Sequence, residues 1–179
     1  DLLRQRVHIP PVPSDSMVRP KLDTRISEAL TSRGVLFLEA PCGYGKSHAV
    51  VSALGGSGSN SDQIRWIALN AQDNAPSRFL TLLAIALDLP ETPEQGRQGG
   101  ATFSDTLAMM QVALARKSHG QPRVLVLDNL QNLGNPAVVE LLQQLVADFP
   151  ADSSIVLISR KALPFETHGL ELENRFTRL

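Results

Sequence analysis

Residues 39–50 read EAPCGYGKSHAV and contain the residue types that hold a phosphate group. Gly43 and Gly45 let the chain curl and bring its amides close to phosphate oxygens. Lys46 supplies a positive charge for the β- and γ-phosphates, and the hydroxyl of Ser47 is a ligand for Mg²⁺. An apolar run precedes this loop and a helical pattern follows it, which is the context that such a loop requires. The stretch therefore predicts a phosphate-binding loop.

The strict form of this motif has a glycine where this chain has Ala40, and alanine is tolerated there if its φ is negative. Cys42 is interpreted as a small loop residue and His48 as a residue of the following helix. The predicted nucleotide-contacting residues are Arg19, Pro41, Cys42, Gly43, Tyr44, Gly45, Lys46, Ser47 and His48. The alternative for the whole stretch is a chance turn that opens a helix.

A magnesium–nucleotide site also needs a carboxylate at the end of a neighbouring strand. Asp128 meets this need because it follows four apolar residues in VLVLD. Ser47 and Asp128 are therefore the predicted metal-associated residues. The other interpretation of Asp128 is a plain cap between a strand and a loop.

The predicted catalytic residues are Lys46, Asp128, Asn129 and Arg160. P-loop ATPases of this layout usually place a second carboxylate directly after the first, but here Asn129 follows, and an amide cannot accept a proton from the attacking water. A missing general base lowers the rate by roughly 10²- to 10⁴-fold. Slow turnover, with Asn129 orienting a water, is the expectation. Glu39 is the nearest other carboxylate in the sequence, and a structural role suits it better than that of a base.

Two arginines complete the predicted site. Arg160 closes the apolar run SSIVLISR, and a strand inserted beside the phosphate-loop strand would aim its guanidinium at the γ-phosphate. The alternative is an ordinary strand-end arginine that faces solvent. Arg19 is predicted to help enclose the adenine side of the nucleotide.

The elements that must position these residues alternate along the chain. Strands are predicted over 34–40, 64–70, 123–130 and 153–160, with a short fifth strand over 169–173, and helices over 21–32, 46–54, 77–89, 103–117 and 136–149. Asp73 or Asn74 is the predicted cap of the third helix, whose first turn contains Pro76. The alternation predicts an α/β three-layer sandwich of the P-loop NTPase type. In it a mostly parallel sheet of about five strands has the phosphate-loop strand at its centre and helices on both faces.

Around this sheet we expect simple domain organisation. Residues 1–20 contain several prolines and predict an extended arm, whereas residues 21–179 predict one nucleotide-binding domain, a fragment of a longer protein. Residues 55–62 and 90–101 are rich in polar residues and glycine and predict surface loops. Met109 and Met110 are predicted to pack in the core.

Composition excludes several classes of function. The 179 residues are 42% hydrophobic and 20% charged with a net charge of −1, which predicts a folded domain without the basic stripe of a nucleic-acid binder. The four histidines lack metal-ligand spacing, and the single cysteine fits a reducing compartment. No apolar run approaches the ~18 to 20 residues that cross a bilayer. A cytoplasmic protein without a membrane partner is expected.

Several stretches together resemble a known family. These stretches are MVRPKLDTRISEAL, LFLEAPCGYGKS, RWIALNAQDNAPSRFLTLLAIAL, VLVLDNLQNLGNP, IVLISRKALPF and ELENRFTRL. In this order and spacing they are similar to the N-terminal nucleotide-binding domain of MalT-type regulators, the large LuxR-family transcriptional activators within the STAND class of signal-transduction ATPases. The resemblance runs from about Val18 to Leu179.

The resemblance implies ADP binding at rest and ATP binding after activation by an inducer, followed by self-association. It also implies a C-terminal helix-turn-helix for DNA binding, which has no counterpart in this chain. Lys46, Ser47, Asp128 and Arg160 match the family's phosphate-loop lysine and hydroxyl, its metal-associated aspartate and its sensor-strand arginine. Two positions depart from the pattern, since Asn129 replaces a second aspartate and Gln131 replaces a histidine. A small residue at position 40 is common in the family.

Three functions therefore compete at this point. The first is a nucleotide-dependent switch that binds ATP or ADP with Mg²⁺, and Asn129 favours it. The second is an actively hydrolysing P-loop ATPase. The third is a degenerate fold that serves as an interaction scaffold, which the intact Gly45, Lys46, Ser47 and Asp128 oppose.

Overall fold

The computed structural model describes residues 3–11, 19–55, 63–89, 102–117 and 124–179. In chain order the elements are η1 (Arg4–Arg6), α1 (Pro20–Thr31), β1 (Val35–Glu39), α2 (Lys46–Ala53), β2 (Ile64–Ala68), η3 (Ala71–Asn74), α3 (Pro76–Ala86), α4 (Phe103–Lys117), β3 (Val124–Asp128), η5 (Leu130–Asn132), α5 (Pro136–Ala147), β4 (Ser154–Ser159), α6 (His168–Leu172) and β5 (Phe176–Arg178). The predicted loops over 55–62, apart from Gly55, and over 90–101 lie outside the described residues, as do residues 12–18 of the predicted arm.

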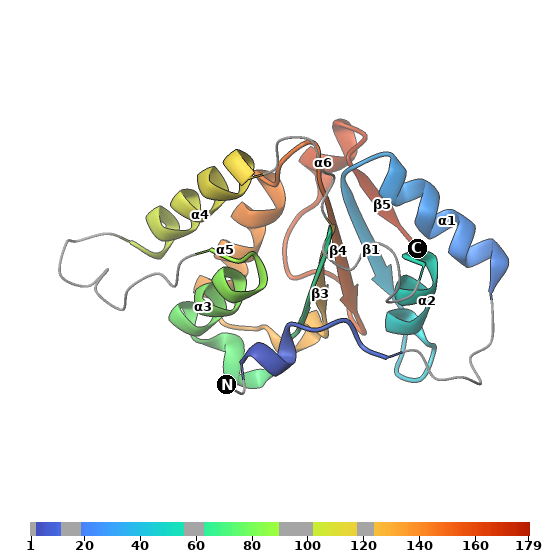
Figure 1. Ribbon diagram of the computed structural model, residues 1–179, viewed down its shortest axis with the longest axis horizontal. Helices are drawn as coiled ribbons and strands as arrows, with labels where there is room; N and C mark the ends of the chain where they lie inside the picture. Colours follow the sequence, from blue (N-terminus) through green and yellow to red (C-terminus); the bar gives the residue numbers. More distant parts are fainter. Residues whose placement is uncertain (1–2, 12–18, 56–62, 90–101, 118–123) are drawn as a thin grey trace.

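The five strands form one sheet in the order β2-β3-β4-β1-β5, and every neighbouring pair is parallel. β1, which leads into the phosphate loop, is internal, with β4 on one side and β5 on the other. Helices α3, α4 and α5 lie on one side of the sheet and α1 and α2 on the other (Figure 1). The predicted α/β three-layer sandwich is confirmed. Since β4 is inserted between β1 and β3, the carboxyl ends of these three strands meet at one edge.

Successive residues of β1 show why an unbroken apolar run forms a strand here. Val35 and Phe37 pack into the core beneath α3, α4 and α5, whereas Leu36 and Leu38 pack into the core beneath α1 and α2. Side chains of a strand alternate between the two faces of a sheet, and both faces are covered by helices. Each residue of the run is therefore buried, and the strand is held firmly up to the point where the phosphate loop begins.

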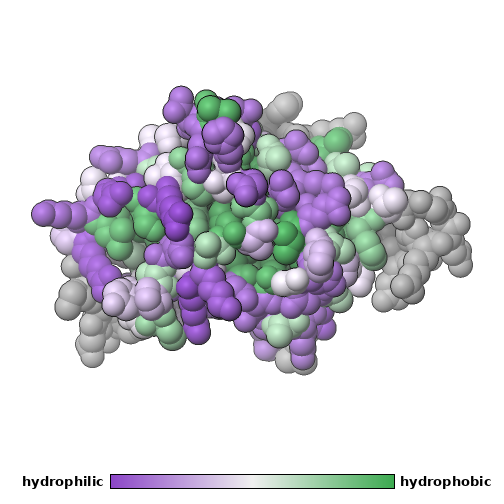
Figure 2. All heavy atoms as spheres, turned by 180° about the vertical axis from the view of Figure 1, so that it is seen from behind, coloured by the Kyte–Doolittle hydropathy of each residue, from purple (hydrophilic) through white to green (hydrophobic). Residues whose placement is uncertain are grey.

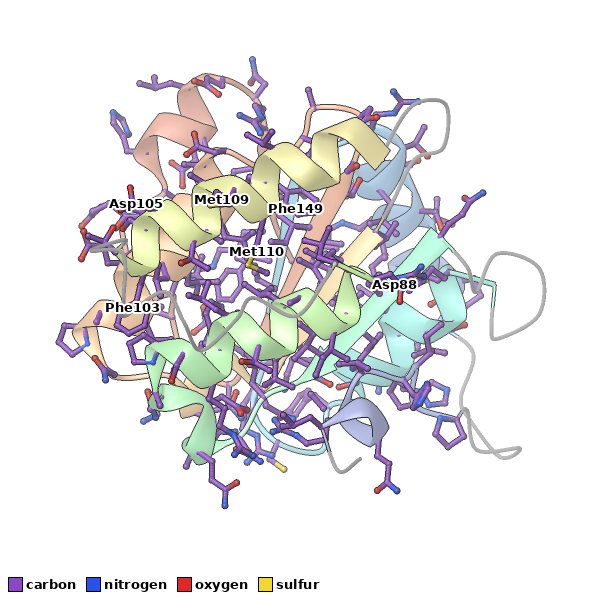
Figure 3. All side chains as sticks on the ribbon, turned by 60° about the vertical axis from the view of Figure 1, so that its left-hand side comes forward. Asp88, Phe103, Asp105, Met109, Met110 and Phe149 are labelled. Atoms are coloured by element: carbon purple, nitrogen blue, oxygen red, sulfur yellow. The ribbon has the colours of Figure 1, made fainter. Side chains whose placement is uncertain are left out.

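Helix α4 forms as predicted, but it buries only part of its apolar surface. Met110 is 4% exposed, whereas Met109 is 71% exposed, so the prediction that both methionines pack in the core is wrong for Met109. Neighbouring helical residues point about 100° apart, and the main contacts of α4 are with α3 and α5. Figure 3 shows Met110 below α4, toward the interior, and Met109 on the helix itself. The helix therefore leaves an apolar outer surface.

The fifth strand lies a few residues later than predicted. Residues 169–173 belong largely to α6, and the strand is β5, which pairs with β1 through Val35 and Phe176. Alternating apolar residues over so short a segment cannot distinguish a strand from one helical turn. Pairing with the free side of β1 determines that Phe176–Arg178 form the fifth strand. These residues are thus part of the sheet.

The predicted cap of α3 is also wrong. The residue before the helix is Ala75, and its side chain makes no capping hydrogen bond. Asp73 and Asn74 instead belong to η3, whose N-terminus is capped by Asn70. Pro76 begins α3, as expected for a residue whose missing N–H is not needed there.

The N-terminal arm is not extended throughout, because η1 forms ahead of its first proline. Leu3 and Val7 pack against the core under α3, whereas Ile9 packs against the core under α2. This part of the arm therefore crosses the β2 edge of the sheet from one face to the other.

Hydrophilic residues cover much of the rear of the molecule, and a hydrophobic area shows at the middle of that face (Figure 2). Within the described part of the chain, no helix combines the length and the apolar character that a membrane crossing requires.

Candidate nucleotide-binding site

The loop between β1 and α2 has the backbone that its glycines predict. Gly43 and Gly45 have φ angles of 82° and 70°, in the left-handed region that favours glycine. Ala40 is not among the described residues with positive φ, so alanine fits the position where the strict motif has glycine. The loop ends at α2, whose first amides point toward it and provide a partial positive charge.

Lys46, the first residue of α2, turns its side chain back over the loop. Its Nζ donates to the carbonyl oxygens of Ala40 at 2.5 Å and Pro41 at 2.9 Å. An ammonium group has three donors, so one remains for a phosphate oxygen. The lysine is thus held beside the space that the loop encloses.

Ser47 and Asp128 come together across the sheet edge. The Ser47 hydroxyl donates to Oδ2 of Asp128 at 2.7 Å, and the backbone N–H of Asn129 donates to Oδ1 at 2.7 Å. Asp128 is only 6% exposed, and this burial raises its pKa. The two hydrogen bonds and the nearby charges of Lys46 and Arg160 oppose that rise. The structure therefore contains a buried carboxylate whose negative charge a divalent cation would compensate.

A cavity of about 330 Å³ opens at this point. Its walls come from the phosphate loop and from the carboxyl ends of β3 and β4, and they comprise Cys42, Gly43, Gly45, Lys46, Ser47, His48, Asp128, Asn129, Gln131, Ile158 and Arg160. Arg160 follows β4, which lies between β1 and β3, so the inserted strand brings the arginine to the cavity as the sequence predicted. Its role in binding stays a prediction.

Three predicted contact residues lie beside the cavity rather than in its wall. Pro41 contributes a carbonyl to Lys46, and Tyr44 is 59% exposed. Arg19 donates from Nη1 to the Tyr44 carbonyl at 3.0 Å, which ties the start of α1 to the phosphate loop. Glu39 does not line the cavity and forms an ion pair with Arg178 of β5 at 2.5 Å. The geometry supports a structural role for Glu39.

Two further features could not be predicted from the residue pattern. Gln131, identified only as a departure from a family pattern, lines the cavity between Asn129 and Arg160. Asp73, taken for a helix cap, is fully buried and paired with Arg6 of the arm and Arg78 of α3. A buried aspartate beside a turn has the same local pattern as a capping aspartate, so the sequence alone could not separate the two roles.

Residues 29–163, about three quarters of the chain, match the family described as AAA domain. The chain belongs to the AAA domain family. This P-loop domain family implies nucleotide and Mg²⁺ binding in general, and the cavity described above has the residues for both.

Curated relatives of this AAA domain are HTH-type transcriptional regulators MalT, which confirms the predicted family resemblance. The chain is 24% identical over 173 residues to MalT of Serratia proteamaculans, covering 92% of this chain and 18% of that protein. It is 28% identical over 153 residues to MalT of Cronobacter sakazakii, covering 81% of this chain and 16% of that protein. The chain thus spans less than a fifth of the length of these relatives.

Solved structures support the fold of the AAA domain. The Aeropyrum pernix ORC1 protein in complex with DNA matches 82% of this chain and 40% of its own, with a TM-score of 0.53 and 19% identity. A DNA replication initiation factor matches 100% of this chain and 51% of its own, with a TM-score of 0.52 and 15% identity. At these identities the likeness concerns the fold alone.

Proposed function

We infer that this AAA domain is an ATP- and ADP-binding switch of a signal-responsive transcriptional regulator. It controls self-association of the full-length protein and hydrolyses ATP slowly or not at all. The observation that carries this proposal is the 2.7 Å contact between the Ser47 hydroxyl and the Asp128 carboxylate, beside Lys46 in one cavity. Magnesium favours hard oxygen ligands and keeps waters and substrate phosphates in its shell. When bound, it supplies positive charge that neutralises the phosphates.

Slow hydrolysis follows from the residues around the metal-associated carboxylate. Asn129 lines the cavity next to Asp128, but its amide cannot take a proton from an attacking water. Glu39 is engaged with Arg178 and lies outside the cavity wall. The alternative, an actively hydrolysing P-loop ATPase, needs a base that these residues do not provide.

Regulation and self-association are proposed from the relatives and from the surface. The relatives are named HTH-type transcriptional regulators, and the chain spans 18% of the length of the first of them. DNA binding would then reside in a C-terminal helix-turn-helix outside this chain, whose own net charge is −1. Phe103, Met109 and Val112 expose apolar surface on α4, which contacts with other domains or copies would bury. A cytoplasmic location fits such a regulator.

Thermal unfolding tests nucleotide binding. A ligand at about 100 times its Kd stabilises the folded state by ~2.7 kcal/mol, which raises the Tm of a chain of this size by roughly 5–11 °C. Mg-ATP and Mg-ADP are expected to produce this shift in the wild-type chain and not in Lys46→Ala. Mass analysis of nucleotide released by denaturing the purified protein identifies the base. Absence of any shift in the wild-type protein would favour the scaffold function instead.

Phosphate release separates the switch from the active ATPase. The switch predicts multiple-turnover rates well below the ~1 s⁻¹ that is ordinary for enzymes. Sustained release at or above that rate by the full-length protein would contradict the switch and support the ATPase.

A further inference from the structure

Gln131 connects two walls of the nucleotide cavity. It lies in η5, directly after β3, and its side-chain amide sits between Asn129 and the start of the segment after β4. The backbone N–H of Arg160 donates to Oε1 of Gln131 at 3.2 Å. The Nε2 of Gln131 donates to Oδ1 of Asn129 at 3.3 Å. A single side chain thus links the carboxyl ends of β3 and β4.

The direction of these two bonds is fixed by chemistry. A backbone N–H can only donate, so the oxygen of the Gln131 amide must face Arg160. The NH₂ group of Gln131 must then face Asn129, and a donor there requires the oxygen of the Asn129 amide. The NH₂ group of Asn129 is consequently turned away from Gln131. The orientation of the Asn129 amide is therefore determined by the backbone of Arg160, two hydrogen bonds away.

The backbone of Asn129 holds this amide at the cavity wall. Its φ is 63°, a left-handed value that asparagine tolerates better than most residues. Its N–H donates to the Asp128 carboxylate at 2.7 Å, and the residue lines the cavity together with Lys46 and Arg160. Among the described residues, the Asn129 NH₂ group has no hydrogen-bond partner. This NH₂ group is therefore available to donate a hydrogen bond to a ligand.

We propose that Gln131 is a positioning residue that turns the Asn129 NH₂ group into the cavity, where it donates to the terminal phosphate of a nucleoside triphosphate. This rests on the proposed nucleotide switch and identifies the residues that distinguish its two states. A diphosphate lacks the group that Asn129 would contact, so the pair favours the triphosphate selectively. An NH₂ group also has no lone pair available for a proton, so this orientation gives up water activation for phosphate recognition.

A double-mutant cycle tests the proposal on the full chain. Affinities for Mg²⁺ with a non-hydrolysable ATP analogue and with ADP are measured by calorimetry for the wild type, Gln131→Leu, Asn129→Gly and the double variant. Glycine is chosen at position 129 because it accepts the left-handed φ that alanine would strain. Gln143→Leu, on the exposed surface of α5, is the matched control and leaves both affinities unchanged.

Loss of a hydrogen bond to a charged group lowers affinity by roughly 10-fold or more. Asn129→Gly is therefore expected to lower the ratio of triphosphate to diphosphate affinity by about 10-fold. Gln131→Leu lowers it by about 3- to 10-fold, because a freed amide still visits the productive orientation. The Gln131→Leu effect disappears in the Asn129→Gly background, since the two residues act as one unit. Gln131→Glu also lowers the ratio, because a carboxylate accepts from Arg160 and draws the Asn129 NH₂ group away from the cavity.

Three results overturn the inference. Equal losses for triphosphate and diphosphate in Gln131→Leu would give Gln131 a structural role only. A Gln131→Leu effect that persists without the Asn129 side chain would mean that Gln131 acts through Arg160 or directly. In both cases nucleotide binding by the wild type stands and the proposed function survives. Absence of binding of either nucleotide to the wild type removes the proposed function and this inference together.

Discussion

Asp73, the buried aspartate that follows β2, allows a direct test of how much one buried ion pair stabilises this fold. Asp73 is 0% exposed and accepts hydrogen bonds from Nη1 and Nη2 of Arg6, from Arg78 Nε at 3.3 Å and from the Asn70 N–H at 2.7 Å. Asp73→Asn keeps the shape but removes the charge. Removing one partner of a buried pair costs about 3–5 kcal/mol. We expect about 3 kcal/mol, because both arginines retain some contact with water.

Chemical and thermal denaturation measure this cost. A loss of about 3 kcal/mol lowers the Tm of a chain of this size by roughly 6–12 °C. Asp88→Asn is the matched control, since Asp88 forms an ion pair with Arg65 at 2.9 Å but its side chain is 70% exposed. An exposed pair contributes less than about 1 kcal/mol. If the two variants lose the same small amount of stability, the buried aspartate does not anchor the arm.

The same aspartate predicts a pH dependence. Burial alone would raise the pKa of Asp73, but the hydrogen bonds and charge of Arg6, with those from Asn70 and Arg78, outweigh it and lower the pKa below the ordinary 3.8. A lowered folded-state pKa stabilises the fold above the unfolded value, and this contribution is lost as pH falls through the folded value. The stability difference between wild type and Asp73→Asn is therefore full at neutral pH and shrinks below pH 3.8. A difference that is constant over this range would contradict the assignment.

Two further substitutions probe the site itself. Asp128→Asn is expected to leave the nucleotide-free Tm unchanged or higher, because burial raises the pKa of this carboxyl and makes its charge costly. The Tm increase caused by Mg-ATP is expected to disappear in this variant. A nucleotide-free Tm that falls by several degrees would argue against a cost of the buried charge. Asn129→Asp supplies the missing proton acceptor and is expected to raise the rate of phosphate release by up to about 10²-fold at saturating Mg-ATP. An unchanged rate would show that the absent carboxylate does not limit hydrolysis. Aspartate tolerates the φ of 63° at this position, so the backbone need not change.

Most of the architecture follows from local patterns. The continuous apolar runs before Glu39, Asp128 and Arg160 predict buried parallel strands, and the helical periodicity between them predicts the covering layers. The loop ending in Gly45 and Lys46 has a backbone that its own residue types specify, so its conformation can be predicted without knowledge of its tertiary contacts. The predictions are wrong where the local pattern is ambiguous. At α6, alternating leucines resemble a strand, and at Met109, exposure depends on which elements α4 contacts.

Local sequence patterns are thus enough to predict a parallel α/β domain with a phosphate loop and a carboxylate at the end of a neighbouring strand. Those features depend on residue type and short-range spacing. The folded chain alone shows that β5 pairs with β1, that Arg6 contacts Asp73, and that Gln131 bonds both Asn129 and the Arg160 backbone. In each case, the local sequence around one residue does not indicate its partner. The Gln131 contacts form because β4 lies beside β3 in the sheet, so the carboxyl ends of these two strands meet at one edge.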